Sequence, residues 1–400
     1  MRYIINVWML LLNLMCGAKT RKLLLAFYLK FNSMTYYPLI VLALTFLVSF
    51  VLTRLAMPWL LNLCRRRGLY DMPNERKVHS NKIPRLGGLL FAPCMSIGMI
   101  AGYFLLSFFE KSSEVPVFRL STVILMVGLF LIFLIGIFDD LFGLKASFKF
   151  LVQFTATVFM PLCGLYINNF YGFCGIYEIP LWVSYPLTVF VCLLIVNSIN
   201  LIDGIDGLSS GLSLIALGAF AALFWCLGIT AYTMLAVGLM GTVVAFFLFN
   251  MFGSEEKGTK TFMGDTGSLV LGYALAYLAI KFAMHNPLIF SYRPEALLVA
   301  YTLLLVPCFD LVRVAVGRLL RGEGIFHPDK THIHHRCLAA GFSMRKSLLL
   351  ILALQFSLIA FNLIGFFVAG LSSTLIVAID IVVFSAFVGW MNYRAKRLAA

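Results

Sequence analysis

The chain is poor in charged residues, which excludes an ordinary soluble protein. Asp, Glu, Lys and Arg make up only 12% of its 400 residues, whereas hydrophobic residues make up 62%. The mean hydropathy is +0.97. Apolar runs of about 20 residues, the length of a bilayer-spanning helix, recur along the chain. We therefore expect an all-α polytopic membrane protein.

A metal site built from paired cysteines is also excluded. None of the nine cysteines shows the paired spacing of zinc ligands; they stand at positions 16, 64, 94, 163, 174, 192, 226, 308 and 337. Most fall inside apolar runs, so we expect buried packing residues. A disulfide between Cys163 and Cys174, both on the predicted outer side, is the alternative.

Eleven membrane spans are predicted, at about residues 38–62, 87–109, 118–138, 149–168, 181–201, 208–226, 231–252, 267–283, 296–317, 347–369 and 373–391. The gaps between them leave no room for a soluble domain, so residues 34–400 are expected to form one membrane domain. Residues 1–33 form a basic leader with three open explanations: a natural start at Met34, an interfacial helix, or a short twelfth span.

The distribution of positive charge predicts the orientation. Most of the 31 lysines and arginines fall in the loops after spans 1, 3, 5, 7 and 9 and in the C-terminal tail. The other loops and their edges hold only Lys111, Arg119, Lys281 and Arg293. Loops rich in lysine and arginine stay in the cytoplasm, so we expect the odd-numbered loops to be cytoplasmic.

Polar residues gather at the helix ends on this predicted cytoplasmic side. The segments are LIGIFDDLFG, VNSINLIDGIDG, FMGDTGS and HPDKTHIHH, and their polar members are Asp139, Asp140, Asn197, Asn200, Asp203, Asp206, Asp265, His327, Asp329, His332, His334 and His335. Chance would scatter such residues over both faces. We therefore expect one composite site, although a single helix-end aspartate is commonly just solvated.

Five aspartates at three helix ends would repel one another unless a cation compensates them. We expect Mg²⁺, with Mn²⁺ as the alternative, because Mg²⁺ prefers oxygen ligands and typically takes one or two carboxylates together with substrate phosphates. Neighbouring residues of a helix point about 100° apart. Asp139 and Asp140 are therefore expected to do different work, one on the metal and one on an acceptor.

The turn after the fifth span and the histidine segment both suit phosphate chemistry. Gly204 and Gly207 let a backbone approach a ligand closely, and asparagines, aspartates and exposed N–H groups suit a nucleotide; a solvated helix cap is the alternative. The histidines lack the helical pair and glutamate of metalloproteases, and Lys330 and Arg336 would oppose a cation. We expect them to hold phosphate rather than zinc.

Two other classes of membrane protein fit less well. Asp310 and Asp380 lie inside spans, as in ion-coupled transporters, but Asp310 is expected to pair with Arg313, and transport predicts broken helices and polar groups at the midplane and on both faces. A CDP-alcohol phosphotransferase would need an arginine and further aspartates after DGIDGLSSG, which this chain lacks at that spacing.

The ordered motifs resemble the polyprenyl-phosphate N-acetylhexosamine-1-phosphate transferases, specifically their WecA/TagO branch. They are DMPNERKVHSNKIPRLGG, GIFDDLFGL, NSINLIDGIDGLSSG, FMGDTGS and HPDKTHIHH. The resemblance implies transfer of a sugar 1-phosphate from a UDP-N-acetylhexosamine to undecaprenyl phosphate, with release of UMP, at the start of cell-surface polysaccharide synthesis. It also implies a bacterial cytoplasmic membrane location, with membrane lipids but no nucleic acid as partners; a homodimer stays open.

The resemblance also implies residue roles. Asp265 would be the principal Mg²⁺ ligand and Asn200 a second one. Asp139, Asp140 and Lys149 would act on the lipid phosphate and on catalysis. The substrate-binding residues would be Arg85, Asn197, Asp203, Asp206, Asn250, Phe262, His332, His334 and His335.

The donor sugar is less closely specified. The related phospho-N-acetylmuramoyl-pentapeptide transferases usually read TPTMGG where this chain reads IPRLGG at 83–88, and their histidine segment differs. We therefore expect N-acetylglucosamine 1-phosphate, with other N-acetylhexosamines as alternatives.

Overall fold

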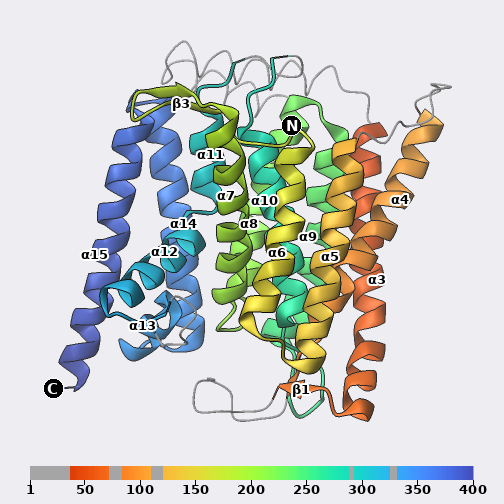
Figure 1. The fold of residues 1–400 in the computed structure, drawn as a ribbon. Coiled ribbons are helices and arrows are strands. Elements are labelled where there is room, and N and C mark those ends of the chain that lie inside the picture. Colours follow the sequence, from red (N-terminus) through yellow and green to blue (C-terminus); the bar gives the residue numbers. More distant parts are fainter. Residues whose placement is uncertain (1–36, 72–82, 110–119, 288–291, 325–330, 400) are drawn as a thin grey trace, which may run out of the picture.

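A computed structural model describes residues 37–71, 83–109, 120–287, 292–324 and 331–399. The leader, much of the first basic loop, and the predicted residues His327, Asp329 and Lys330 lie outside these ranges. The described chain is a bundle of long helices with two short hairpins (Figure 1).

The helices coincide with all eleven predicted spans. They are α3 (Tyr37–Arg67), the 3-10 turn η1 (Gly87–Leu90) with α4 (Phe91–Phe109), α5 (Leu120–Phe142), α6 (Ala146–Leu162), α7 (Leu181–Leu201), α8 (Leu208–Leu227), α9 (Thr230–Phe252), α10 (Gly264–Ala283), α11 (Ala296–Leu303) with α12 (Leu305–Leu320), α14 (Met344–Phe367) and α15 (Ser373–Ala399). Within the described ranges, nine helices are long and apolar enough to cross a membrane, and α6 is shorter. The chain is therefore a multi-pass membrane protein.

The predicted ninth span is broken. Helices α11 and α12 meet at an angle of 73°. Pro307 lies in the first turn of α12 and cannot continue a straight helix, because its ring would clash with the carbonyl of Leu303. Gln355 of α14 satisfies backbone groups freed by the break: its Nε2 donates to Thr302 O at 2.8 Å, and its Oε1 accepts from Val306 N at 3.1 Å. The break is thus stabilised inside the bundle.

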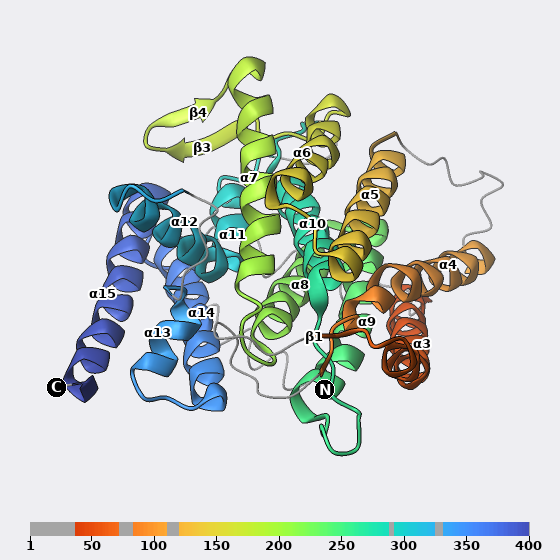
Figure 2. The ribbon, with the colours of Figure 1, turned by 60° about the horizontal axis from the view of Figure 1, so that its bottom comes forward.

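Helix α10 is the centre of the bundle. Its residues from Thr266 to Ala283 are all buried, and it packs against α5 and α7; Figure 2 shows it surrounded by neighbouring helices. Small residues allow this approach: a Cβ at Gly272 would lie 2.8 Å from the Cα of Val196. Close packing of small residues is a main source of helix association in lipid.

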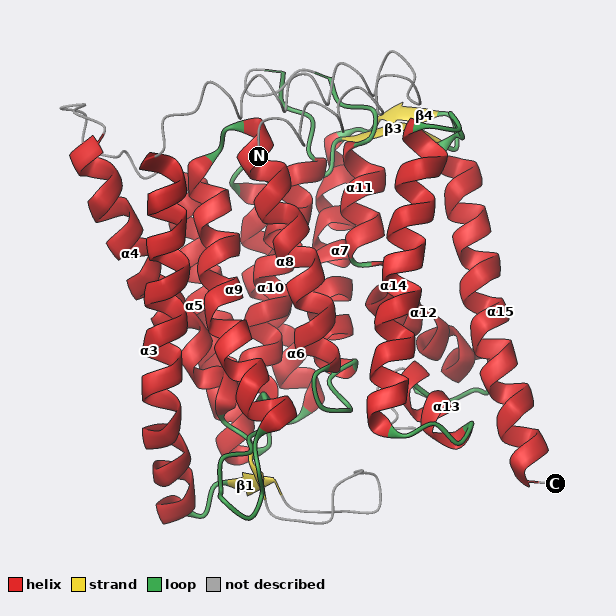
Figure 3. Ribbon diagram, turned by 180° about the vertical axis from the view of Figure 1, so that it is seen from behind, coloured by secondary structure: helices red, strands yellow, loops and turns green. Residues whose placement is uncertain are grey.

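The two ends of the bundle differ. The hairpin of β1 (Tyr70–Asp71) and β2 (Ile83–Pro84), the short helix α13 (Ile333–Ala339) and the C-terminus lie at one end. The hairpin of β3 (Asn169–Phe173) and β4 (Ile176–Glu178) lies at the other (Figure 3). We call the first the β1 end. It carries the segments predicted to share one side of the membrane, whereas the hairpins and α13 were not predicted.

The cysteines are free thiols throughout the described ranges. The alternative of a Cys163–Cys174 disulfide is therefore wrong. Cys64, Cys94, Cys192 and Cys337 are buried among apolar side chains, as expected.

Candidate active site

Three helix ends bring the predicted aspartates together at the β1 end. Asp139 and Asp140 lie in the last turn of α5, Asp265 lies in the first turn of α10, and the turn 202–207 joins α7 to α8. Segments more than 100 residues apart in the sequence therefore meet, as the composite-site prediction requires.

Asp140 caps the N-terminus of α10. Its Oδ1 accepts from Asp265 N at 2.9 Å, and its Oδ2 accepts from Thr266 N at 2.9 Å and from Thr266 Oγ1 at 2.6 Å. Gly264 makes this approach possible, because it has a positive φ of 74° and a Cβ there would lie 2.7 Å from Asp140 Oδ2. A buried carboxylate at a helix N-terminus stabilises the unpaired N–H groups and complements the helix dipole. Asp140 thus fixes where Asp265 stands.

Lys149 connects the other two carboxylates. Its Nζ donates to Asp139 Oδ2 at 2.8 Å and also to Asp265 Oδ1. Asp139 Oδ1 accepts from Leu144 N at 2.8 Å. Asp139 and Asp140 therefore face different partners, and the space between Asp139 and Asp265 holds a positive charge.

Asn200 completes the surroundings of Asp265. Its Nδ2 donates to Asp265 Oδ1 at 2.7 Å and to Ser268 Oγ at 2.8 Å. Asn197 stands one turn earlier and instead contacts α6, where its Nδ2 donates to Gln153 Oε1 at 2.8 Å. Asn200 therefore contacts the carboxylate of Asp265 directly, whereas Asn197 joins α7 to α6.

The donor atoms fit a divalent cation. The side chain of Asp265 is 34% exposed, so water can complete a coordination shell around it. No set of three or more His, Cys, Asp or Glu ligands for a metal occurs among the described residues. One or two protein oxygens with several waters is the coordination that Mg²⁺ favours.

The turn 202–207 is held from α9 and from the loop before α10. Asn250 Oδ1 accepts from Gly207 N at 2.7 Å, and Asn250 Nδ2 donates to Thr261 O at 2.9 Å. Asp206 Oδ2 pairs with Lys260 Nζ at 2.7 Å. Lys260 was not predicted, because a single lysine in a loop between two spans resembles a topology signal.

Asp203 in this turn has a strongly perturbed pKa. The pKa of Asp203 is raised to about 7, first by burial and then by the nearby carboxylates of Asp206, Asp265 and Asp140. Such perturbation by burial and like charge is typical of functional sites. A bound cation would reverse it.

The segments IPRLGG and FMGDTGS form one unit. Phe262 N donates to Pro84 O at 2.8 Å, and Gly87 N donates to Phe262 O at 3.0 Å. Arg85 donates through its guanidinium to the main-chain oxygen of Asp140. Arg85 therefore lies against the end of α5 at Asp140, and Phe262 joins the two segments. Substrate binding by Arg85 and Phe262 stays a prediction.

The histidine segment is anchored by Asp310 of α12. Asp310 is 1% exposed; it accepts from Ile333 N at 2.9 Å, contacts His332 Nδ1 at 2.8 Å and pairs with Arg313 at 2.6 Å. The predicted pair with Arg313 is confirmed. The contact with His332 was not predicted, since no local pattern links an aspartate inside a span to a loop 22 residues later.

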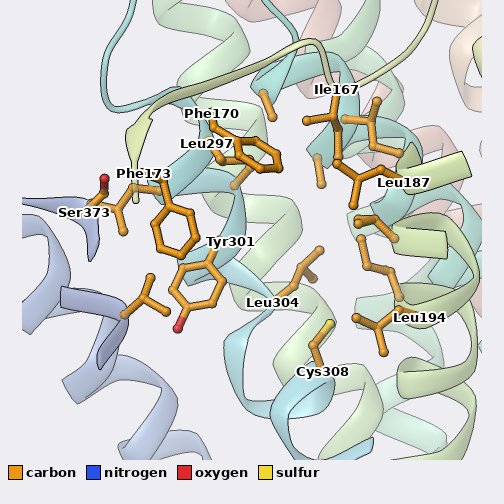
Figure 4. Close-up of a pocket in the computed structure, with 18 of the residues that line it drawn as sticks. Ile167, Phe170, Phe173, Leu187, Leu194, Leu297, Tyr301, Leu304, Cys308 and Ser373 are labelled. Atoms are coloured by element: carbon orange, nitrogen blue, oxygen red, sulfur yellow. The ribbon is translucent and has the colours of Figure 1, made fainter. Parts of the chain in front are cut away.

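Two cavities flank this arrangement. A polar one of about 850 Å³ at the β1 end is lined by Arg65, Tyr70, Lys260 and the segment 253–258. An apolar one of about 310 Å³ lies between α7, α10, α11 and α15, with Phe170, Leu187, Leu297 and Tyr301 among its lining (Figure 4). Among the described residues, no charged side chain lines the second cavity.

Fold and site together define a polytopic membrane protein that gathers carboxylates, lysines and a glycine-rich turn at one end of its bundle, an arrangement suited to phosphate transfer. The chain belongs to glycosyl transferase family 4, whose family model matches residues 122–283, the segment from α5 to α10.

Curated relatives extend this match over most of the chain. A probable undecaprenyl-phosphate N-acetylglucosaminyl 1-phosphate transferase of Bacillus subtilis (strain 168) is 32% identical over 79% of this chain and 82% of its own. The undecaprenyl-phosphate alpha-N-acetylglucosaminyl 1-phosphate transferase of Yersinia pestis is 29% identical, covering 83% and 86%. The protein of the same name from Escherichia coli (strain K12) is 28% identical, covering 76% and 78%.

Proposed function

We propose that this enzyme transfers N-acetylglucosamine 1-phosphate from UDP-N-acetylglucosamine to undecaprenyl phosphate. The observation that carries the proposal is the meeting of Asp139, Lys149 and Asp265 at one membrane face, beside the turn held by Asn250 and Lys260. The relatives named for this reaction support the choice of lipid and sugar.

The location of the site suits the two substrates. A polyprenyl phosphate keeps its chain in the bilayer and its phosphate at the surface, whereas a nucleotide sugar arrives from water. The carboxylates lie at helix ends, and the polar cavity opens beside the turn that carries Asp206. This end would face the cytoplasm of a bacterium, because loops rich in lysine and arginine stay on that side of the membrane.

The reaction joins two anions, so orientation and charge compensation are its main requirements. An oxygen of the lipid phosphate forms a bond to the β-phosphorus of the donor. The bond from that phosphorus to the oxygen bridging it to the α-phosphate breaks, and UMP leaves with the electron pair. A two-step route, in which the Asp139 carboxylate attacks first, is the alternative.

Mg²⁺, with Mn²⁺ as the alternative, would be held by Asp265 and Asn200, and would neutralise charge on the donor diphosphate. The chain's own groups do the remaining work. Lys149 holds Asp139 and would attract the lipid phosphate, while Asp140 fixes the start of α10. Asp206, Asn250 and Phe262 would bind the uridine, and Lys260, the partner of Asp206, lines the polar cavity that would receive the nucleotide.

The test uses purified protein, undecaprenyl phosphate, Mg²⁺ and UDP-N-acetylglucosamine labelled separately in the sugar and the α-phosphate. The proposal requires sugar label in the lipid and α-phosphate label in UMP. UDP-N-acetylgalactosamine is the matched control donor. Efficient transfer from the control alone would overturn the sugar assignment, and sugar transfer that released UDP would overturn the reaction.

A further inference from the structure

His334 sits directly on the turn between α7 and α8. It is 2% exposed, and its imidazole covers Gly204. A Cβ at Gly204 would lie 2.8 Å from His334 Cδ2 and closer still to Nε2 and Cε1. Even the smallest side chain at position 204 would therefore displace the ring or the turn. Gly204 has no positive φ, so its role is to make room for the imidazole.

The same histidine is poorly placed to bind an anion. Burial and the neighbouring ring of His335 lower the pKa of His334 to about 3, so the imidazole is neutral at physiological pH. Its Nδ1 is buried and has no hydrogen-bond partner among the described residues. In the protein without substrate the ring is therefore neutral and closed off from solvent, and the phosphate contact expected from the sequence stays a prediction.

Helix α13, which carries His334, is held by Asp310 of α12 and by an apolar cluster that includes the turn. Asp310 accepts the main-chain N–H of Ile333, at the start of α13. Ile333 and Cys337 belong to one buried cluster with Ile205 of the turn. Movement of α13 is therefore transmitted to the turn, because close-packed apolar groups do not deform freely.

From this contact we propose that His334 is a positioning residue, which seats α13 against Gly204 and so fixes the turn that carries Asp203 and Asp206. The inference rests on the proposed function for its substrate. It differs from a substrate contact in what it requires of residue 204: glycine and histidine form a matched pair, and the fit between them sets the affinity for the nucleotide.

A double-mutant cycle tests the pair. The variants are Gly204→Ala, His334→Ala and their combination, and the measurements are UMP binding by calorimetry and KM and kcat for the donor. We expect His334→Ala to weaken UMP binding by about tenfold with a smaller change in kcat. Gly204→Ala should weaken it at least as much, because the ring forces the turn aside.

The combination decides between the two roles. We expect UMP binding at least about fivefold tighter in the double variant than in Gly204→Ala, since removal of the ring relieves the clash. If His334 contacted substrate, the loss of UMP affinity from His334→Ala would add to the loss from Gly204→Ala. UMP binding weaker in the double variant than in Gly204→Ala would therefore overturn the proposal. Leu338→Ala, on the same helix, is the matched control, because the three atoms nearest to a Cβ at Gly204 all belong to His334. Combined with Gly204→Ala it should give no such recovery.

The test also covers a variant that does not fold and a wild type that shows no transfer. If Gly204→Ala does not fold, the proposal requires the double variant to regain a monodisperse, cooperatively unfolding protein, and failure to regain it would count against the pair. UMP binding needs no lipid acceptor and no turnover. Absence of phosphosugar transfer in the wild type would therefore refute the proposed function while the coupling between residues 204 and 334 could still be measured.

Discussion

Asp140 is expected to act on the fold of the site rather than on a reacting atom. Its carboxylate accepts three hydrogen bonds from the first turn of α10. Hydrogen bonds to a charged group contribute about 1.5–3 kcal/mol each, and loss of an N-cap side chain costs about 0.5–2 kcal/mol. These contributions overlap, so we expect Asp140→Ala to lower the free energy of unfolding by about 3–5 kcal/mol. Asp140→Asn, which keeps one acceptor oxygen, should cost about 1–2 kcal/mol.

The assay is thermal unfolding of the purified protein in detergent, measured beside turnover. Asp140→Ala should unfold at a clearly lower temperature and lose turnover, whereas Asp140→Asn should retain part of both. Asp139→Asn is the matched control, since Asp139 does not cap α10; it should lose turnover with a smaller change in unfolding temperature. An Asp140→Ala variant as stable as the wild type but inactive would refute the capping role.

Three further predictions concern neighbouring groups. The pKa of Asp203, about 7 when folded against an ordinary 3.8, keeps it protonated where the unfolded chain is ionised. The free energy of unfolding of the metal-free protein should therefore fall as pH rises from about 4 to 7. Asp203→Asn should make the unfolding temperature less dependent on pH over this range. The same pH dependence in the variant and the wild type would contradict the raised pKa of Asp203. Lys260→Met should weaken UMP binding by about tenfold, because Asp206 loses its 2.7 Å partner, and unchanged binding would count against that pair. Gln355→Leu should lower the free energy of unfolding by about 1–3 kcal/mol, because the break between α11 and α12 loses two hydrogen bonds. An unfolding temperature equal to that of the wild type would show that other groups satisfy the backbone at the break.

Features that depend on local composition could be predicted from the sequence. Apolar length alone located the spans, since a helix must cross a hydrocarbon layer of fixed thickness. The broken ninth span was not predicted, although Pro307 was a visible signal. Its stabilisation depends on Gln355, a polar residue in another span whose partner cannot be read from spacing.

The site also has features that could be predicted from the sequence and features that could not. Helix-end aspartates on one side of the membrane predicted a shared site, and the approximately 100° between consecutive helix residues separated Asp139 from Asp140. The anchoring of His332 by Asp310 depends on tertiary contact. The burial of His334, which the sequence predicts to hold phosphate, depends on tertiary contact as well. A pattern of histidines gives residue types but not which of them the fold encloses.

In the proposed mechanism, Asp265 holds the cation on which phosphosugar transfer depends. The most direct measurement is Mg²⁺-dependent transfer of label from UDP-N-acetylglucosamine to undecaprenyl phosphate by the wild type and by Asp265→Asn, with unfolding temperature recorded for both. We expect lipid-linked label and UMP from the wild type, and no Mg²⁺-dependent transfer from a folded Asp265→Asn. Near-normal turnover by that variant would contradict it.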